Sequence, residues 1–178
     1  MGDINVFAGP MKSGKSQRML NELKRQEITG KDILIFKPEI DNRAGEKYIA
    51  TRAGEKVEAI SIRNIEELEN YKTDVYFIDE FQFLQGDVSV IEKLAQNGKK
   101  FFISGLNLTS EKKPFGKMGD LMCLADNVQL LTSVCEICKT DNAIFSYYKG
   151  KKDTDIVIGD EQYIPVCRKC YNKLSKGE

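Results

Sequence analysis

The sequence predicts an α/β protein, with a mostly parallel sheet covered by helices on both faces, followed by a small C-terminal module that carries cysteine pairs. Three observations predict this architecture. A glycine-rich segment at residues 9–16 joins an apolar run to a helical pattern, further apolar runs alternate with helical patterns, and two Cys-x-x-Cys pairs stand near the C-terminal end. Alternating apolar strands and helices are typical of a parallel sheet that is buried on both faces. We therefore expect an α/β domain over residues 1–131 and a second module over residues 132–178.

The glycine-rich segment has the sequence Gly-Pro-Met-Lys-Ser-Gly-Lys-Ser and matches the pattern Gly-x-x-x-x-Gly-Lys-[Ser/Thr] of a phosphate-binding loop. Residues 4–8 before it form a short apolar run typical of a strand, and residues 17–28 after it place apolar side chains on one helical face. In that context the backbone N–H groups of the loop and the positive end of the helix dipole bind polyphosphate. The residues expected to bind ATP and its metal here are Gly9, Pro10, Met11, Lys12, Ser13, Gly14, Lys15 and Ser16.

Two carboxylates follow the apolar run at residues 75–78. In a phosphate-binding loop Lys15 reaches the β- and γ-phosphates and Ser16 offers its hydroxyl to Mg²⁺, so Asp79 at the tip of a neighbouring strand is expected to hold the same ion. Glu80 points to another side, and the chain has no histidine. Glu80 is therefore the candidate base for a hydroxyl that attacks the γ-phosphate, the alternative being that it only caps the following helix.

The remaining elements of the predicted sheet follow in chain order. We expect strands over residues 32–36, 100–104 and 128–131, and helices over residues 64–71, 88–97 and 121–125. Residues 37–62 are polar and contain Pro38, Gly45 and Gly54, which indicates a long connection with a short hairpin. Cys123 lies among apolar residues and is expected to be a buried small side chain.

The two Cys-x-x-Cys pairs have the spacing of a structural zinc site with four thiolate ligands. The predicted ligands are Cys135, Cys138, Cys167 and Cys170. Between the pairs, residues 144–148 and 156–158 are apolar enough to form two strands. We therefore expect a small module held together by Zn²⁺.

Composition limits the classes of function. Lys and Arg together number 27, as do Asp and Glu, so no overall basic charge favours a nucleic-acid partner. No apolar run approaches the roughly 20 residues of a membrane-spanning helix, and the first residues do not resemble a signal peptide. We expect a cytoplasmic protein whose thiols stay reduced, which favours metal binding over disulfides.

Taken in order, these motifs resemble those of the type II thymidine kinases, the tetrameric, zinc-containing class found in animals, many bacteria and some large DNA viruses. The motifs that carry the resemblance are Gly9–Ser16, Asp41-Asn42-Arg43, Asp79–Phe83, Gly105-Leu106 with Pro114-Phe115-Gly116, both cysteine pairs and Tyr163. They span nearly the whole chain.

The resemblance implies transfer of the γ-phosphoryl group of ATP to the 5′-hydroxyl of thymidine, which gives thymidine monophosphate for DNA synthesis. It implies catalytic roles for Glu80 as proton acceptor and for Lys15, Arg43 and Asp41. It adds Gln82 to the residues that bind ATP and Mg²⁺, which already include Asp79. It implies a nucleoside pocket built from Met11, Phe83, Leu106, Phe115, Ser146 and Tyr163. It also implies a homotetramer, feedback inhibition by thymidine triphosphate, and a structural zinc that pins a loop, the lasso, which closes over the base.

The chain departs from the family pattern at several positions. Lys12 replaces a common aromatic residue in the phosphate loop, Phe81 a small residue, Asn107 a common Asp and Ser110 a frequent aromatic residue. Two other functions remain open at this stage. One is a kinase for another nucleoside, such as deoxyuridine or a modified pyrimidine, and the other is a nucleotide-switched module that grips DNA or a protein through its zinc ribbon.

Overall fold

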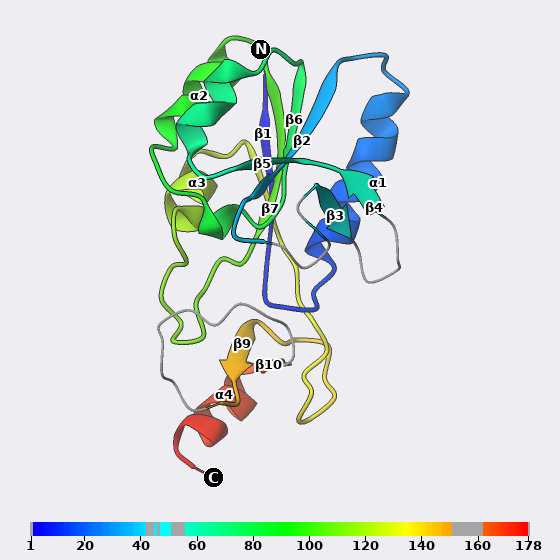
Figure 1. The fold of residues 1–178 in the computed structure, drawn as a ribbon. Coiled ribbons are helices and arrows are strands. Elements are labelled where there is room, and N and C mark those ends of the chain that lie inside the picture. Colours follow the sequence, from blue (N-terminus) through cyan, green and yellow to red (C-terminus); the bar gives the residue numbers. More distant parts are fainter. Residues whose placement is uncertain (1, 42–44, 46, 51–55, 151–161, 178) are drawn as a thin grey trace.

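The computed structural model describes residues 2–41, 45, 47–50, 56–150 and 162–177, and its main feature is a six-stranded sheet in the order β5-β2-β6-β7-β1-β8 (Figure 1). Every pairing between these strands is parallel, which confirms the predicted sheet. The strands are β1 (Ile4–Ala8), β2 (Ile33–Pro38), β5 (Ile60–Ile62), β6 (Val75–Ile78), β7 (Lys100–Gly105) and β8 (Asn127–Leu130).

Helices cover both faces of the sheet, as predicted (Figure 1). The helices of this part are α1 (Lys15–Glu27), η1 (Ile65–Asn70), η2 (Phe81–Phe83), α2 (Ser89–Gln96) and α3 (Met118–Leu124), where η marks a 3₁₀ helix. One apolar cluster joins the sheet to α2, α3 and η1, and a second joins it to α1. The helix expected over 64–71 is the 3₁₀ helix η1. At its start the Glu67 carboxylate accepts the Asn64 N–H at 2.9 Å.

The central strand β6 shows how the sequence builds two cores. Successive strand side chains point to opposite faces, so Tyr76 belongs to one cluster and Phe77 to the other. Tyr76 stacks on Phe101 with ring centroids 4.8 Å apart, and Phe77 stacks on Phe102 at 4.8 Å. A strand that is apolar at every position is therefore required, which explains the unbroken apolar run in the sequence.

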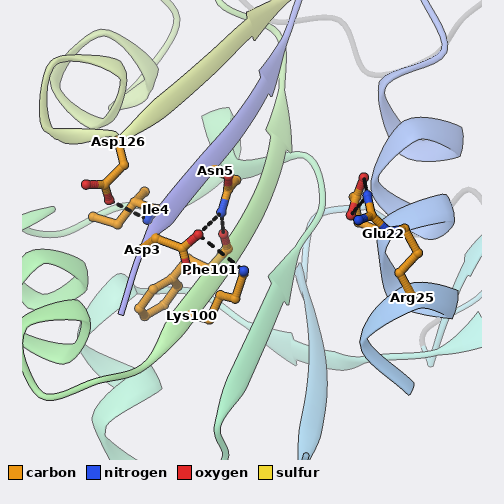
Figure 2. Close-up of polar contacts among 8 residues, drawn as sticks. All are labelled: Asp3, Ile4, Asn5, Glu22, Arg25, Lys100, Phe101 and Asp126. Atoms are coloured by element: carbon orange, nitrogen blue, oxygen red, sulfur yellow. Dashed lines mark hydrogen bonds and ion pairs between the residues drawn. The ribbon is translucent and has the colours of Figure 1, made fainter. Parts of the chain in front are cut away.

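A polar network fixes the amino end of β1 between its two neighbours (Figure 2). The Ile4 N–H donates to the Asp126 carboxylate at 2.8 Å, just before β8. The Asn5 side chain donates to Asp3 at 3.0 Å and to the Phe101 carbonyl of β7 at 3.3 Å. The register of β1 is thereby set at one end, so the segment that leaves its other end has a defined starting point.

The connection between β2 and η1 contains the predicted hairpin and one strand that was not predicted. The hairpin pairs β3 (Tyr48–Ala50) with β4 (Lys56–Glu58), and β5 joins the main sheet beside β2. The fully buried Lys37 ammonium donates to the carbonyls of Asp41 at 2.8 Å, Tyr48 at 3.2 Å and Gly45. A buried cation thus anchors this connection through backbone groups.

The C-terminal module holds a two-stranded antiparallel sheet and a helix at one end of the molecule (Figure 1). Its elements are β9 (Phe145–Tyr148), β10 (Tyr163–Val166) and α4 (Arg168–Ser175). The strand expected at 144–148 is confirmed, whereas the one expected at 156–158 lies outside the described residues. The strand β10 was not predicted.

One prediction about α3 is wrong. Cys123 is exposed, because α3 begins at Met118 and turns Met118 and Leu121 toward the core instead. Among the described residues, no helix combines the length and apolar character needed to cross a membrane.

Candidate active site and metal centre

The phosphate loop lies where β1 ends and α1 begins, at the carboxyl edge of the sheet. Gly9 is required there because a Cβ at this position would lie 2.5 Å from the Leu131 carbonyl oxygen. Lys15 is 7% exposed, and its ammonium donates to the Pro10 carbonyl at 2.7 Å across the loop. The Ser13 hydroxyl donates to the same carbonyl at 2.8 Å. The loop is therefore held closed by its own side chains, with the lysine at its centre.

The next group joins this loop to two other strands. The Ser16 hydroxyl donates to the Asp79 carboxylate at 3.2 Å, and the Ser104 hydroxyl contacts the same carboxylate oxygen. Asp79 and Ser104 are buried at the carboxyl ends of β6 and β7. Such a group of hard oxygen ligands fits Mg²⁺, which prefers carboxylate and hydroxyl oxygens. Sequence reasoning missed Ser104, although it is a polar residue at the end of an apolar strand.

Glu80 follows Asp79 with a left-handed backbone (φ 51°), and the two carboxylates contact different side chains. Its buried carboxylate accepts a hydrogen bond from the Gln82 side chain at 2.5 Å. The side-chain amide oxygen of Gln82 in turn accepts the Leu106 N–H at 2.9 Å. Within this described segment the Glu80 side chain makes no capping hydrogen bond to η2, so the alternative of a simple helix cap gains no support.

Three of the residues expected at the nucleoside end, Phe83, Leu106 and Phe115, lie beside this chain of hydrogen bonds. The Phe83 and Phe115 rings meet edge to face at 5.4 Å. Gly116 has φ +52°, and a Cβ there would lie 2.2 Å from the backbone carbonyl oxygen of Gln82. The loop that carries Phe115 can therefore pack directly on η2 only because this position is glycine.

The C-terminal module contributes Ser146 and Tyr163. The buried Ser146 hydroxyl accepts the Met11 N–H of the phosphate loop at 3.0 Å. The Tyr163 ring of β10 packs against the Tyr148 ring of β9 with centroids 5.0 Å apart, so the position of Tyr163 depends on the module. Of the predicted pair after β2, Asp41 is buried, and Arg43 lies outside the described residues.

The four predicted metal ligands come together in the C-terminal module. Each thiol sulfur lies within 4.8 Å of the others, and the sulfurs of Cys138 and Cys167 are 3.7 Å apart. Zn–S bonds of about 2.3 Å in a tetrahedron would place sulfurs about 3.8 Å apart, so the donor set fits zinc. Cys135, Cys167 and Cys170 are buried, whereas Cys138 is exposed.

Thiols of this cluster have pKa values shifted in opposite directions. Hydrogen bonds from Thr140 lower the pKa of the Cys138 thiol to about 6, so it is readily a thiolate at neutral pH. Burial, followed by the neighbouring thiols, raises the pKa of Cys170 to about 12. A divalent metal ion would stabilise all the thiolates at once, because metal binding replaces their protons.

Comparison with known proteins identifies the family. The sequence model of a family described as thymidine kinase matches residues 2–171. The chain belongs to the thymidine kinase family. A thymidine kinase from the bacterium Pseudothermotoga lettingae is 36% identical over 179 residues, which cover 98% of this chain and 97% of that protein. The match extends through both cysteine pairs and is consistent with the type II class that the motifs indicated.

Proposed function

We propose that this protein transfers the γ-phosphoryl group of ATP to the 5′-hydroxyl of thymidine, which gives ADP and thymidine monophosphate. The observation that supports this most directly is the meeting of Ser16 and Asp79 at 3.2 Å beside the phosphate loop, with Glu80 as the next residue. Membership of the thymidine kinase family supports the acceptor, and the phosphate loop supports the nucleotide donor.

At the phosphate end, Gly9–Ser16 would surround the β- and γ-phosphates with backbone N–H groups, and Lys15 would neutralise part of their charge. Ser16 and Asp79 would hold Mg²⁺, which neutralises charge on the phosphates when bound. By resemblance, Asp41 and Arg43 belong to the same end, where a guanidinium can stabilise charge on the transferring group. Ser16 and Asp79 lie at the carboxyl edge of the sheet, where β1 and β6 end.

At the acceptor end, Glu80 would accept the proton of the 5′-hydroxyl as that oxygen forms its bond to the γ-phosphorus. The bond between the γ-phosphorus and the bridging oxygen then breaks, and that oxygen leaves with ADP. Gln82 would orient the Glu80 carboxylate, because its side-chain amide nitrogen donates to Glu80 while its amide oxygen accepts the Leu106 N–H. The carboxylate is thus fixed next to the expected position of the nucleoside.

The thymine ring would lie among Met11, Phe83, Leu106, Phe115, Ser146 and Tyr163, of which two come from the C-terminal module. Aromatic and apolar walls suit a flat base. We further propose residues 1–131 and 132–178 as the two domains, Zn²⁺ as the structural metal, a homotetramer and inhibition by thymidine triphosphate. The domain division and the zinc rest on the cysteine pairs and their spacing, whereas the tetramer and the inhibition follow from the resemblance.

A steady-state assay with Mg·ATP and a panel of deoxynucleosides, including thymidine, deoxyuridine and deoxycytidine, tests the reaction. We expect thymidine-dependent release of ADP with formation of the monophosphate. Turnover with another pyrimidine deoxynucleoside but not with thymidine would show that the other nucleoside is the substrate. Absence of turnover on all of them, from protein that holds zinc and binds ATP, would favour the nucleotide-switched binding module.

The role of Glu80 has a separate test. Glu80→Gln removes the proton acceptor but keeps the size of the side chain, so we expect turnover to fall roughly 10²- to 10⁴-fold with ATP binding retained. Glu27→Gln, an exposed acid at the end of α1, is the matched control and should leave turnover unchanged. Near-normal turnover in Glu80→Gln would show that the base assignment is wrong.

A further inference from the structure

Three contacts tie two adjacent residues of the phosphate loop to the C-terminal module. The Met11 N–H donates to the Ser146 hydroxyl at 3.0 Å, and the Lys12 ammonium forms an ion pair with the Glu136 carboxylate at 2.5 Å. The Ser133 hydroxyl donates to the Lys12 carbonyl at 3.0 Å. We call these three contacts the brace. They hold the backbone and the side chain of the loop at once.

The loop has a physical reason to need such support. Lys12 has φ 63°, in the left-handed region that a residue other than glycine seldom adopts. Strained backbone of this kind persists when surrounding contacts hold it. If the contacts are lost, a smaller fraction of the protein has the loop in its binding conformation, and the apparent affinity for the ligand falls with that fraction.

The brace starts next to the metal ligands. Glu136 lies between Cys135 and Cys138, and its N–H donates to the Pro165 carbonyl of β10 at 2.9 Å. Its carbonyl accepts the Lys139 ammonium at 2.7 Å. Lys12 and Glu136 both line a cleft of about 520 Å³, together with Ser133 and Cys135. The position of Glu136 therefore depends on the fold of the cysteine cluster.

We propose that the zinc-binding module acts as a positioning element for the phosphate donor, so that occupancy of the four-cysteine site and ATP binding support each other. The positioning residues are Glu136 and Ser133, and they act through Lys12. This inference rests on the proposed function, because it assigns ATP to the phosphate loop. It gives the module a second role beside that of closing over the thymidine base.

The direction of the change in ATP affinity on loss of the Glu136 charge tests the proposal. Removing an acid close to an anion site strengthens anion binding through long-range electrostatics. Weaker ATP binding on loss of the Glu136 charge therefore has to come from loss of the ion pair. The Lys12 and Glu136 side chains are 31% and 37% exposed, so solvent screening keeps the effect modest.

The experiment is calorimetric titration of the full-length, zinc-loaded protein with Mg²⁺ and β,γ-imido-ATP, followed by a separate titration with thymidine. Glu136→Gln and Ser133→Ala should each weaken binding of the ATP analogue about two- to fivefold. Thymidine affinity and zinc content should stay unchanged. Asp141→Asn, which removes an acid from the wall of the same cleft, is the matched control and should leave binding unchanged or slightly tighter.

The outcomes separate cleanly. Unchanged or tighter binding in Glu136→Gln, or equal weakening in all three variants, would overturn the brace. Normal thymidine turnover in the wild type together with failure of this binding test would reject the brace but not the proposed reaction. The expected binding changes without turnover on any nucleoside would reject the proposed reaction but not the brace.

Reciprocal coupling gives a second measurement. Because linkage between two binding sites is mutual, the ATP analogue should slow the release of zinc to a chromogenic chelator in the wild-type protein. The slowing should be smaller in Glu136→Gln. Equal slowing in both proteins would show that the coupling does not pass through this contact.

Discussion

The sheet and the C-terminal module reach a folded state by different means. The sheet buries two apolar clusters, one on each face, built from strands that are apolar at consecutive positions. The module buries one small cluster in which Cys135, Cys167 and Cys170 are themselves members. A small module seldom supplies enough apolar burial for independent stability, so a structural metal commonly makes up the difference. The comparison teaches that loss of a metal ligand and loss of a core ring should unfold different parts of this protein.

The largest effect is expected from loss of a buried metal ligand. Cys135→Ser should abolish zinc binding and disorder the module, since structural zinc contributes roughly 10–16 kcal/mol of binding free energy that is coupled to folding. Thymidine binding should be lost, while the cooperative unfolding of the sheet remains. Zinc analysis measures metal binding, and limited proteolysis measures whether the module is disordered while the sheet stays folded. Retention of about one zinc per chain would contradict the four-thiolate site.

A core ring in the sheet should give the opposite pattern. Phe77→Ala removes a fully buried ring stacked on Phe102, and we expect the free energy of unfolding to fall by about 3–5 kcal/mol with zinc content unchanged. Phe77→Leu keeps most of the volume and should cost about 1 kcal/mol. Chemical denaturation followed by circular dichroism measures both variants. Zinc loss in folded Phe77→Ala would show that the two parts are not separable in this way.

The buried Lys37 should give an intermediate effect, although it contacts only backbone carbonyls. Lys37→Met keeps the aliphatic stem but leaves those carbonyls without their donor, which should cost roughly 2–4 kcal/mol. Lys31→Met, at an exposed lysine, is the control and should change the free energy of unfolding by less than about 0.5 kcal/mol. Chemical denaturation of the two variants and the wild type gives the free energies of unfolding to be compared. Equal stability would mean that the connection after β2 does not depend on this cation.

The smallest effect should come from Cys123, which contrasts with the four cluster cysteines. Because Cys123 is exposed, Cys123→Ser should change the free energy of unfolding by less than about 0.5 kcal/mol. The native zinc-loaded wild type should show a single fast-reacting thiol with a thiol reagent, and the variant none. Fast reaction of further thiols would show that zinc does not protect the cluster.

Much of the fold and of the candidate site could be predicted because their signals are local. The phosphate loop, the carboxylates after β6 and the cysteine pairs each occupy a few consecutive residues whose spacing alone restricts the chemistry. The helix ends and β5 were predicted less well, since a segment such as 60–62 is too short for periodicity to distinguish a strand from a loop. The exposure of Cys123 was missed because apolar neighbours in sequence do not fix which face of a short helix is buried.

The sequence by itself determined the parallel α/β fold, the phosphate loop and the four thiol ligands, because apolar periodicity and short motifs encode them within a few residues. Only the tertiary structure decided that Ser104 contacts Asp79 and that Lys12 of the phosphate loop pairs with Glu136 of the module. The physical reason is that such partners are far apart along the chain. Their meeting depends on strand order and on the packing of two separate cores, which no local pattern specifies.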